Sequence, residues 1–464
     1  MARVDPLLGS SIEELADAIR ARRVSPSELA ESSLARIAAL DGRLGAFITV
    51  ADSSARAEAR ERERELDGGH DRGPLHGIPV ALKDLYDTAG VRTTAGSRIL
   101  RDNVPANDAE PVRRLREAGV VVLGKTSLHE WAYGVTNDNP HFGPARNPYD
   151  LERIPGGSSG GSAVALATGM CAASLGTDTG GSIRIPASLC GIVGLKPNSG
   201  RVSVRGVIPL SWTLDHAGPM TRTVRDAAIV LDVIAGYDAD DPGSVDRPAV
   251  DGLARIEDGV RGITLGLPRE HFFARADAEV AKLVRAAARV LESVGARLVE
   301  VGMPWIDEIA EAQATVLGAD AASYHHERLE TRADDFGADV RRRLDRGRTR
   351  TGPEVAAARR ARARLRREME LLLRDVDALL VPATPISAPL RVGQDAVEAA
   401  ARLTAFTAPF NLTGVPAISV PCGFTKQGLP VGLQLASASW TEQKLLRIAR
   451  AYERETAWPR LATL

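Results

Sequence analysis

Residues 155–197 read PGGSSGGSAVALATGMCAASLGTDTGGSIRIPASLCGIVGLKP. Glycine and serine cluster near both 158 and 181, and between the clusters the pattern predicts a helix of small residues over 161–168 and a strand over 172–178. A flexible linker would not carry a buried apolar helix between two Gly/Ser runs. The small side chains indicate instead that the backbone here approaches a ligand or another backbone closely.

On both sides of this stretch, predicted strands and helices alternate, which is typical of the α/β class. A strand from Ile78 ends near Lys83, and apolar strands are predicted over 120–124, 376–382 and 416–423. Residues 262–267 and 296–301 bracket a helix and form a βαβ-like unit. Capping signals and periodicity predict further helices starting at 11 and spanning 25–40, 51–67, 108–119, 223–237 and 353–375.

The composition is that of an ordinary globular protein: 464 residues, 44% hydrophobic and 26% charged, with a net charge of −1. This balance excludes a disordered chain and argues against nucleic acid or an anionic membrane as the main partner. No apolar run reaches the ~18 residues of a membrane span, and the N-terminal MARVDPLLGSS lacks the apolar core of a signal peptide. Three cysteines are too few for a disulfide framework, so we expect a cytoplasmic protein.

Two short motifs match known patterns without their structural context. Residues 119–126 (GVVVLGKT) fit the phosphate-loop pattern, yet a helix is predicted before Gly119 and the residues between the two glycines form a predicted strand. GGSSGG contains the nucleophile-elbow pattern of α/β-hydrolases, centred on Ser158 and on Ser159, but no strand is predicted directly before it. Four histidines, at 216, 271, 325 and 326, lie downstream, so a Ser/Asp/His triad stays an alternative.

Metal and RNA binding find less support in the sequence. No metal-ligand motif is present, and the adjacent His325 and His326 would point about 100° apart on a helix, so we expect no metal. Residues 341–374 hold 13 arginines. A solvated helix face is the simpler interpretation of that run, and contact with RNA is the alternative.

The second Gly/Ser cluster carries the catalytic hypothesis. Gly180, Gly181 and Ser182 follow a predicted strand and can present consecutive backbone N–H groups to an oxyanion. Ser182 would then be a nucleophile, and Lys83, flanked by apolar residues, is the best-placed base. The residues alone leave a second interpretation open, in which both loops are tight structural turns and Lys83 is a buried ion-pair partner.

Seven segments in order resemble the amidase signature enzymes, from about residue 10 to the C-terminus. They are PLHGIPVALKD (74–84), GKTSLHEWA (124–132), FGPARNPYD (142–150), PGGSSGGSAVALATG (155–169), LGTDTGGSIRIPASLCGIVGLKP (175–197), LDHAGPMTRTVRDAA (214–228) and FNLTGVPAISVPCG (410–423). The resemblance implies one α/β domain over 1–464, with N-terminal helices of 1–60 packed on it. It also implies a mixed central sheet of about ten strands flanked by helices.

The same resemblance implies a Ser–cis-Ser–Lys catalytic group that needs no metal or cofactor. Ser182 would be the nucleophile, Lys83 the base, and Ser158, after a cis bond from Gly157, the bridging serine. To act as a base, Lys83 must have a pKa well below ~10.4. The implied supporting residues are Ser159 and Thr177 through their hydroxyls, Arg184 as an orienting group, and Thr179, Gly180, Gly181 and Ser182 through oxyanion N–H groups.

The leading functional hypothesis is a stand-alone amidase. It would hydrolyse a small carboxamide or ureido C–N bond to a carboxylate plus ammonia or amine through a Ser182 acyl-enzyme. The alternative is the A subunit of a glutamyl-tRNA(Gln) amidotransferase, from which residues 132–139 (AYGVTNDN) and 211–216 (SWTLDH) depart. A non-catalytic family member is a third possibility, which the presence of all three catalytic residues argues against.

The sequence says little about the substrate pocket or about assembly. Trp131, Tyr133 and Trp212 are candidate substrate-binding residues, although such aromatics are more often part of a core. We expect a small-molecule amide as substrate, no membrane or nucleic-acid partner, and a homodimer as one possible state.

Overall fold

The computed structural model describes residues 6–393 and 395–463, which form an α/β fold around one large mixed sheet. The main sheet has 11 strands in the order β1-β3-β2-β6-β8-β7-β12-β13-β11-β9-β10, one more than the sequence predicted, and β4 and β5 form a separate pair. The strands are β1 (Phe47–Val50), β2 (Pro79–Lys83), β3 (Val121–Thr126), β4 (Asp138–Asn139), β5 (Gly143–Pro144), β6 (Ala173–Thr177), β7 (Val193–Lys196), β8 (Ala217–Thr221), β9 (Thr264–Pro268), β10 (Arg297–Val301), β11 (Ala378–Pro382), β12 (Ala417–Phe424) and β13 (Pro430–Ser437).

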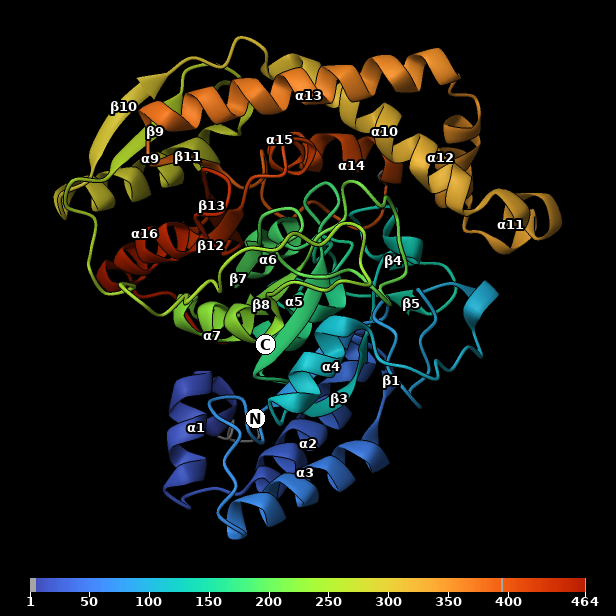
Figure 1. Ribbon diagram of the computed structural model, residues 1–464, viewed down its shortest axis with the longest axis vertical. Helices are drawn as coiled ribbons and strands as arrows, with labels where there is room; N and C mark the ends of the chain where they lie inside the picture. The colour runs from blue at the N-terminus through green and yellow to red at the C-terminus, as the bar shows by residue number, and fades with distance from the viewer. Residues whose placement is uncertain (1–5, 394, 464) are drawn as a thin grey trace.

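Helices cover the sheet and gather at both ends of the molecule (Figure 1). Those that surround the sheet are α1 (Ile12–Arg20), α2 (Pro26–Leu44), α3 (Asp52–Asp67), α4 (Glu110–Glu117), α5 (Gly160–Ala167), α6 (Arg184–Cys190), α7 (Val224–Ile234), α8 (Phe272–Arg275), α9 (Ala278–Ser293) and α16 (Glu442–Glu455). The remainder are α10 (Ile309–Tyr324), α11 (His326–Thr331), α12 (Ala338–Arg348), α13 (Gly352–Asp375), α14 (Ala396–Thr404) and α15 (Ala408–Leu412). Helices α1–α3 lie at one end, and α10, α12 and α13 lie at the other (Figure 1).

Local chemistry sets where several helices begin. Ser11 with Glu14 and Ser25 with Glu28 form the predicted capping boxes of α1 and α2, each serine accepting a backbone N–H three residues on. The predicted βαβ unit is confirmed, because β9 and β10 are parallel neighbours and α9 connects them. No helix among the described residues is long and apolar enough to cross a membrane.

The central strands bring the two Gly/Ser clusters to one edge of the sheet. β2 is parallel to both β3 and β6, so the carboxyl ends of β2 and β6 lie side by side. Lys83 is the last residue of β2 and Thr177 the last of β6. All eight residues of α5, which begins after Ser159, are buried, because small side chains let this helix fit between β2, β6 and α6.

Candidate active site

Lys83 lies at the centre of a buried cluster of hydroxyl groups. Its Nζ donates to Ser158 Oγ and to Thr177 Oγ1, each at 2.7 Å, and its side chain has no solvent exposure. Burial lowers the pKa of Lys83 to about 7, and the negative charges of Asp178 and Asp215 oppose this shift. The amine is therefore largely uncharged in mildly alkaline solution.

The first Gly/Ser cluster connects Lys83 to Ser182. The Gly157–Ser158 peptide bond is cis, as the resemblance implied. The Ser159 hydroxyl lies 3.3 Å from both the backbone N and O of Thr177, donating to the carbonyl and accepting from the amide. The Ser159 backbone N–H donates to the Ser182 carbonyl at 3.2 Å. These bonds hold Ser182 next to the Ser158–Ser159 pair.

The second cluster forms the loop 178–182 between β6 and α6. Among the described residues, none accepts a hydrogen bond from the backbone N–H groups of 179, 180, 181 or 182. Four successive N–H groups without acceptors, beside a serine hydroxyl, are donors that an oxyanion could use, and the oxyanion role of this loop stays a prediction. Ser182 itself is 5% exposed, and Gly180 is partly exposed.

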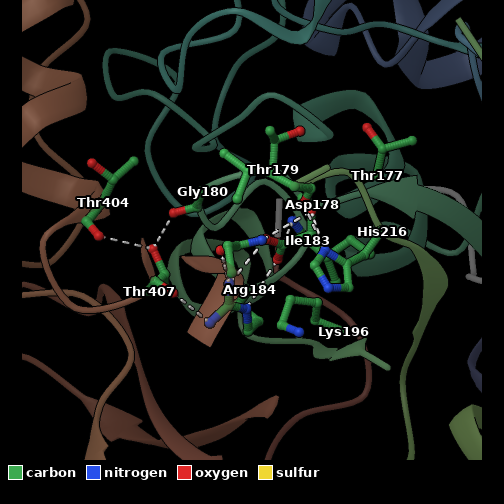
Figure 2. Close-up of polar contacts among 12 residues, drawn as sticks. Thr177, Asp178, Thr179, Gly180, Ile183, Arg184, Lys196, His216, Thr404 and Thr407 are labelled. Atoms are coloured by element: carbon green, nitrogen blue, oxygen red, sulfur yellow. Dashed lines mark hydrogen bonds and ion pairs between the residues drawn. The ribbon is translucent and has the colours of Figure 1, made fainter. Parts of the chain in front are cut away.

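Arg184 anchors this loop from below (Figure 2). Its guanidinium donates two hydrogen bonds of 2.9 Å to the Asp178 carboxylate, and both side chains are fully buried. Burial alone would raise the pKa of Asp178, but the charge and hydrogen bonds of Arg184 hold it well below its usual range. Arg184 also donates to the Gln434 and Asn411 side chains, at 2.6 Å each. Arg184 thus joins the loop to the C-terminal part of the chain.

A cavity of about 510 Å³ opens above Ser182. Thr179, Gly180 and Ser182 line one side of it. Its other walls are mostly apolar and come from 132–135, α10, α12, α14 and the segments around Leu210 and Ile306. They include Tyr133, Leu210, Ile306, Ile309, Leu317, Val397 and Ala400. Its charged lining residues are Arg275, Asp307, Arg343, Arg346 and Arg350, with His271 beside them.

The structure separates the three aromatic residues that were candidates for substrate binding. Tyr133 lines the cavity, with Arg343 5.5 Å above its ring. Trp131 does not line it and is buried against His325 and Phe336. Trp212 is also absent from the lining and is 54% exposed. Aromatic identity in the sequence gave no sign of which way these side chains face.

Sequence reasoning missed several residues that hold the site together. Gln313 donates to the Thr179 carbonyl, Thr407 to the Gly180 carbonyl, and Asp215 accepts from the Thr179 hydroxyl. Burial raises the pKa of Asp215 to about 6, although its carboxylate accepts three hydrogen bonds that oppose the shift. Gln313 and Thr407 lie outside the seven segments quoted above, and Asp215, although inside 214–228, is brought to the loop only by tertiary packing.

The rival interpretations of the motifs lack structural support. Val121–Thr126 is strand β3, which pairs with β1 and β2, so its amides are not free to bind phosphate. The last strand before Ser158 is β5, which ends at Pro144 and does not lead directly into the serine as a nucleophile elbow requires. In the described parts of the chain, no histidine ring hydrogen-bonds to Ser158, Ser159 or Ser182, and no three His, Cys, Asp or Glu residues are placed to hold a metal ion.

Similarity to known proteins agrees with the geometry. A relative from Myxococcus xanthus (strain DK1622), named as the A subunit of glutamyl-tRNA(Gln) amidotransferase, is 44% identical over 95% of this chain and 96% of its own length. The crystal structure of the protein of the same name from Thermotoga maritima has a TM-score of 0.84, at 36% identity over 99% of this chain and 100% of that one. The peptide amidase of Stenotrophomonas maltophilia has a TM-score of 0.86, at 35% identity over 99% of this chain and 98% of that one.

Two of these three proteins are named as the A subunit of glutamyl-tRNA(Gln) amidotransferase, which is the alternative hypothesis from the sequence. They therefore favour the amidotransferase interpretation over the stand-alone amidase. Both interpretations imply the same fold and the same family. The family model described as Amidase matches residues 28–446, nearly the whole chain. The chain therefore belongs to the amidase signature family.

Proposed function

We propose that the protein hydrolyses a primary carboxamide through an acyl-enzyme on Ser182, with Lys83 as the base and Ser158 as the relay between them. The observation that carries the proposal is the 2.7 Å contact between a fully buried Lys83 amine and Ser158, beside Ser182. An amine whose pKa is lowered to about 7 can accept a proton at neutral pH. It replaces the histidine that other serine hydrolases use.

The reaction follows from this arrangement. Neutral Lys83 accepts the Ser158 hydroxyl proton while Ser158 accepts the proton of Ser182, whose oxygen attacks the amide carbon. The oxyanion forms against the free N–H groups of the loop 179–182. The relay returns the proton to the leaving nitrogen, ammonia departs, and an acyl-enzyme ester remains. Water then attacks this ester by the same relay and releases the carboxylate.

We further propose glutamine as the amide donor, with the chain acting as the A subunit of an amidotransferase. The 44% identity to a relative of that name over nearly the full length supports this choice. The cavity also offers positive charge for a carboxylate, because Arg343 and Arg346 line it and Arg346 forms no ion pair within the described residues. In such a complex the released ammonia would pass to a partner that holds the aminoacyl-tRNA.

A stand-alone amidase is the second candidate, and the shape of the cavity favours it. A volume of about 510 Å³ with walls from residues such as Ile309, Leu317 and Val397 suits a larger apolar acyl group. The chain is also similar over nearly its whole length to the S. maltophilia protein named as a peptide amidase. The two candidates share the catalytic steps and differ in the substrate.

Ammonia release separates the two candidates. The purified chain is incubated with glutamine and with a panel of alkyl, aryl and peptide amides, with and without amidotransferase partner proteins and tRNA. Glutaminase activity that appears only with the partners supports the amidotransferase role. Faster turnover of another amide by the chain alone supports the stand-alone enzyme and contradicts glutamine as the donor.

A fluorophosphonate probe tests the chemistry independently of the substrate. We expect the probe to label Ser182, and Ser182→Ala to abolish labelling while the melting temperature stays close to that of the wild type. Ser188→Ala is the matched control, because Ser188 is a buried serine of α6 that hydrogen-bonds to Thr384 outside the site. Labelling of Ser158 or Ser159 instead would contradict the assignment of the nucleophile.

A further inference from the structure

Within the described residues, the backbone N–H groups of the loop 179–182 have no acceptor, whereas side chains hydrogen-bond to its Thr179 and Gly180 carbonyls. In a trans peptide the C=O of one residue and the N–H of the next point in opposite directions. The direction of the Gly180 N–H is therefore set by the Thr179 carbonyl, and that of the Gly181 N–H by the Gly180 carbonyl. A side chain that hydrogen-bonds to either carbonyl therefore also fixes the direction of the N–H group of the next residue.

Gln313 of α10 holds the first carbonyl. Its Nε2 donates to Thr179 O at 2.8 Å, across 134 residues of sequence. The other end of the same amide, Oε1, is buried and has no hydrogen-bond partner among the described residues. The side-chain amide therefore makes one hydrogen bond, the one from Nε2 to the loop. Because the partner in the loop is a carbonyl oxygen, the side chain at position 313 must be a donor.

Thr407, just before α15, holds the second carbonyl (Figure 2). Its Oγ1 donates to Gly180 O at 2.6 Å, and a longer contact of 3.3 Å runs to Thr404 O. The same hydroxyl packs against Gly181, where an added Cβ would lie 2.1 Å from Oγ1 and where φ is +135°. The glycine is needed at 181 because the hydroxyl occupies the space of a side chain.

We propose that Gln313 and Thr407 are positioning residues for the oxyanion site: they fix the Thr179 and Gly180 carbonyls so that the next two N–H groups face the reacting carbonyl. This inference rests on the proposed function, since it assigns a role within that reaction. Neither side chain needs to touch the substrate for this role. Their shared effect is to orient donors that the transition state uses more strongly than the substrate does.

The test combines Gln313→Glu, which replaces the donor with an acceptor of nearly equal shape, with Thr407→Val and Thr407→Ser. The control is Thr413→Val, because Thr413 is also buried, and its hydroxyl donates to Pro409 O away from the loop. Kinetics are measured with the best amide from the panel, together with the rate of fluorophosphonate labelling and the melting temperature of each variant.

We expect Gln313→Glu and Thr407→Val to lower kcat by roughly 10- to 100-fold with KM changed less than about twofold, because the lost alignment acts in the transition state. Labelling should slow in parallel. Thr407→Ser should keep kcat within about threefold of the wild type, since its hydroxyl remains. Thr413→Val should keep wild-type kcat.

The outcomes separate this inference from the proposed function. If the wild type is labelled at Ser182 and folded Gln313→Glu and Thr407→Val keep near-normal kcat, the positioning role is wrong and the proposed reaction stands. A KM increase without a loss of kcat, or a Thr407→Ser variant as slow as Thr407→Val, also contradicts the inference. If the wild type neither labels at Ser182 nor releases ammonia from any amide, the proposed function itself fails.

Discussion

Lys83 combines two properties that free lysine does not have together: complete burial and a hydroxyl network that can exchange protons. Below about pH 7 the amine is protonated and cannot accept the proton of Ser158; above it, the neutral form dominates. We therefore expect kcat/KM to rise with pH along an acid limb whose midpoint is near 7. A profile that is flat or falls across this range would show that Lys83 is not the base.

The Lys83→Arg variant keeps a positive charge at this position but removes the base. Arginine stays protonated at every accessible pH, so we expect a loss of about 10²–10⁴-fold in kcat that alkaline buffer does not restore. Circular dichroism and the melting temperature verify that the variant is folded. Recovery of activity at high pH would argue for a base other than residue 83.

A substitution at Asp215 offers a second way to change the pKa of Lys83. Its carboxylate favours the ammonium form of Lys83 and so opposes the lowering of that pKa. Removing the charge in Asp215→Asn is expected to shift the acid limb of kcat/KM to lower pH. Asp17→Asn, an exposed change of the same charge on α1, should leave the limb in place. A shift toward higher pH would contradict the electrostatic account.

The sequence singled out Ser158 and Ser182 by their Gly/Ser clusters and Lys83 by its apolar neighbours, and the family resemblance gave the three residues their roles. It could not locate Gln313 or Thr407, because their roles depend on contacts with residues more than 130 positions away. The aromatic candidates show the same limit: a tryptophan or tyrosine packs equally well in a core or at a cavity wall.

Helix ends show which local signals are reliable. Helix α2 begins at the predicted cap but runs to Leu44, four residues beyond the expected end. Gly42 lies inside the helix with open space around it, whereas Gly45 adopts φ +63° and ends it. A glycine stops a helix when the chain needs its left-handed conformation, and the sequence alone does not say which glycine that is.

Helices α10 and α12 cross at a pair of glycines in the cavity wall, and the pair is asymmetric. A Cβ at Gly347 would lie 2.1 Å from the Gly318 carbonyl oxygen, whereas a Cβ at Gly318 would lie 3.5 Å from Gly347 Cα. We expect Gly347→Ala to lower the free energy of unfolding by about 1–3 kcal/mol, because the helices must separate. Gly318→Ala should be neutral or up to about 1 kcal/mol stabilising. Urea unfolding of both variants measures this; equal effects would refute the close crossing.

The order of the strands joins the two halves of the chain. β12 pairs with β7 and β13 pairs with β11, so the last two strands complete the middle of the sheet. Without β12 and β13, the part of the sheet that runs from β1 to β7 and the part that runs from β11 to β10 share no strand pairing. We expect calorimetry to show one cooperative unfolding transition for residues 1–464. Two separable transitions would contradict the prediction of a single domain.

The central position of β12 and β13 also affects how the protein is made. A ribosome that adds about 5–20 residues per second finishes strands β1–β11 well before it completes β13. Until then the nascent chain exposes two open sheet edges, those of β7 and β11. Before residue 407 is added, the loop 179–182 lacks its contact with Thr407, and Arg184 lacks its contacts with Asn411 and Gln434. If the loop acts as proposed, we therefore expect activity only once β13 has been made, and we expect the open edges of the sheet to favour aggregation until then.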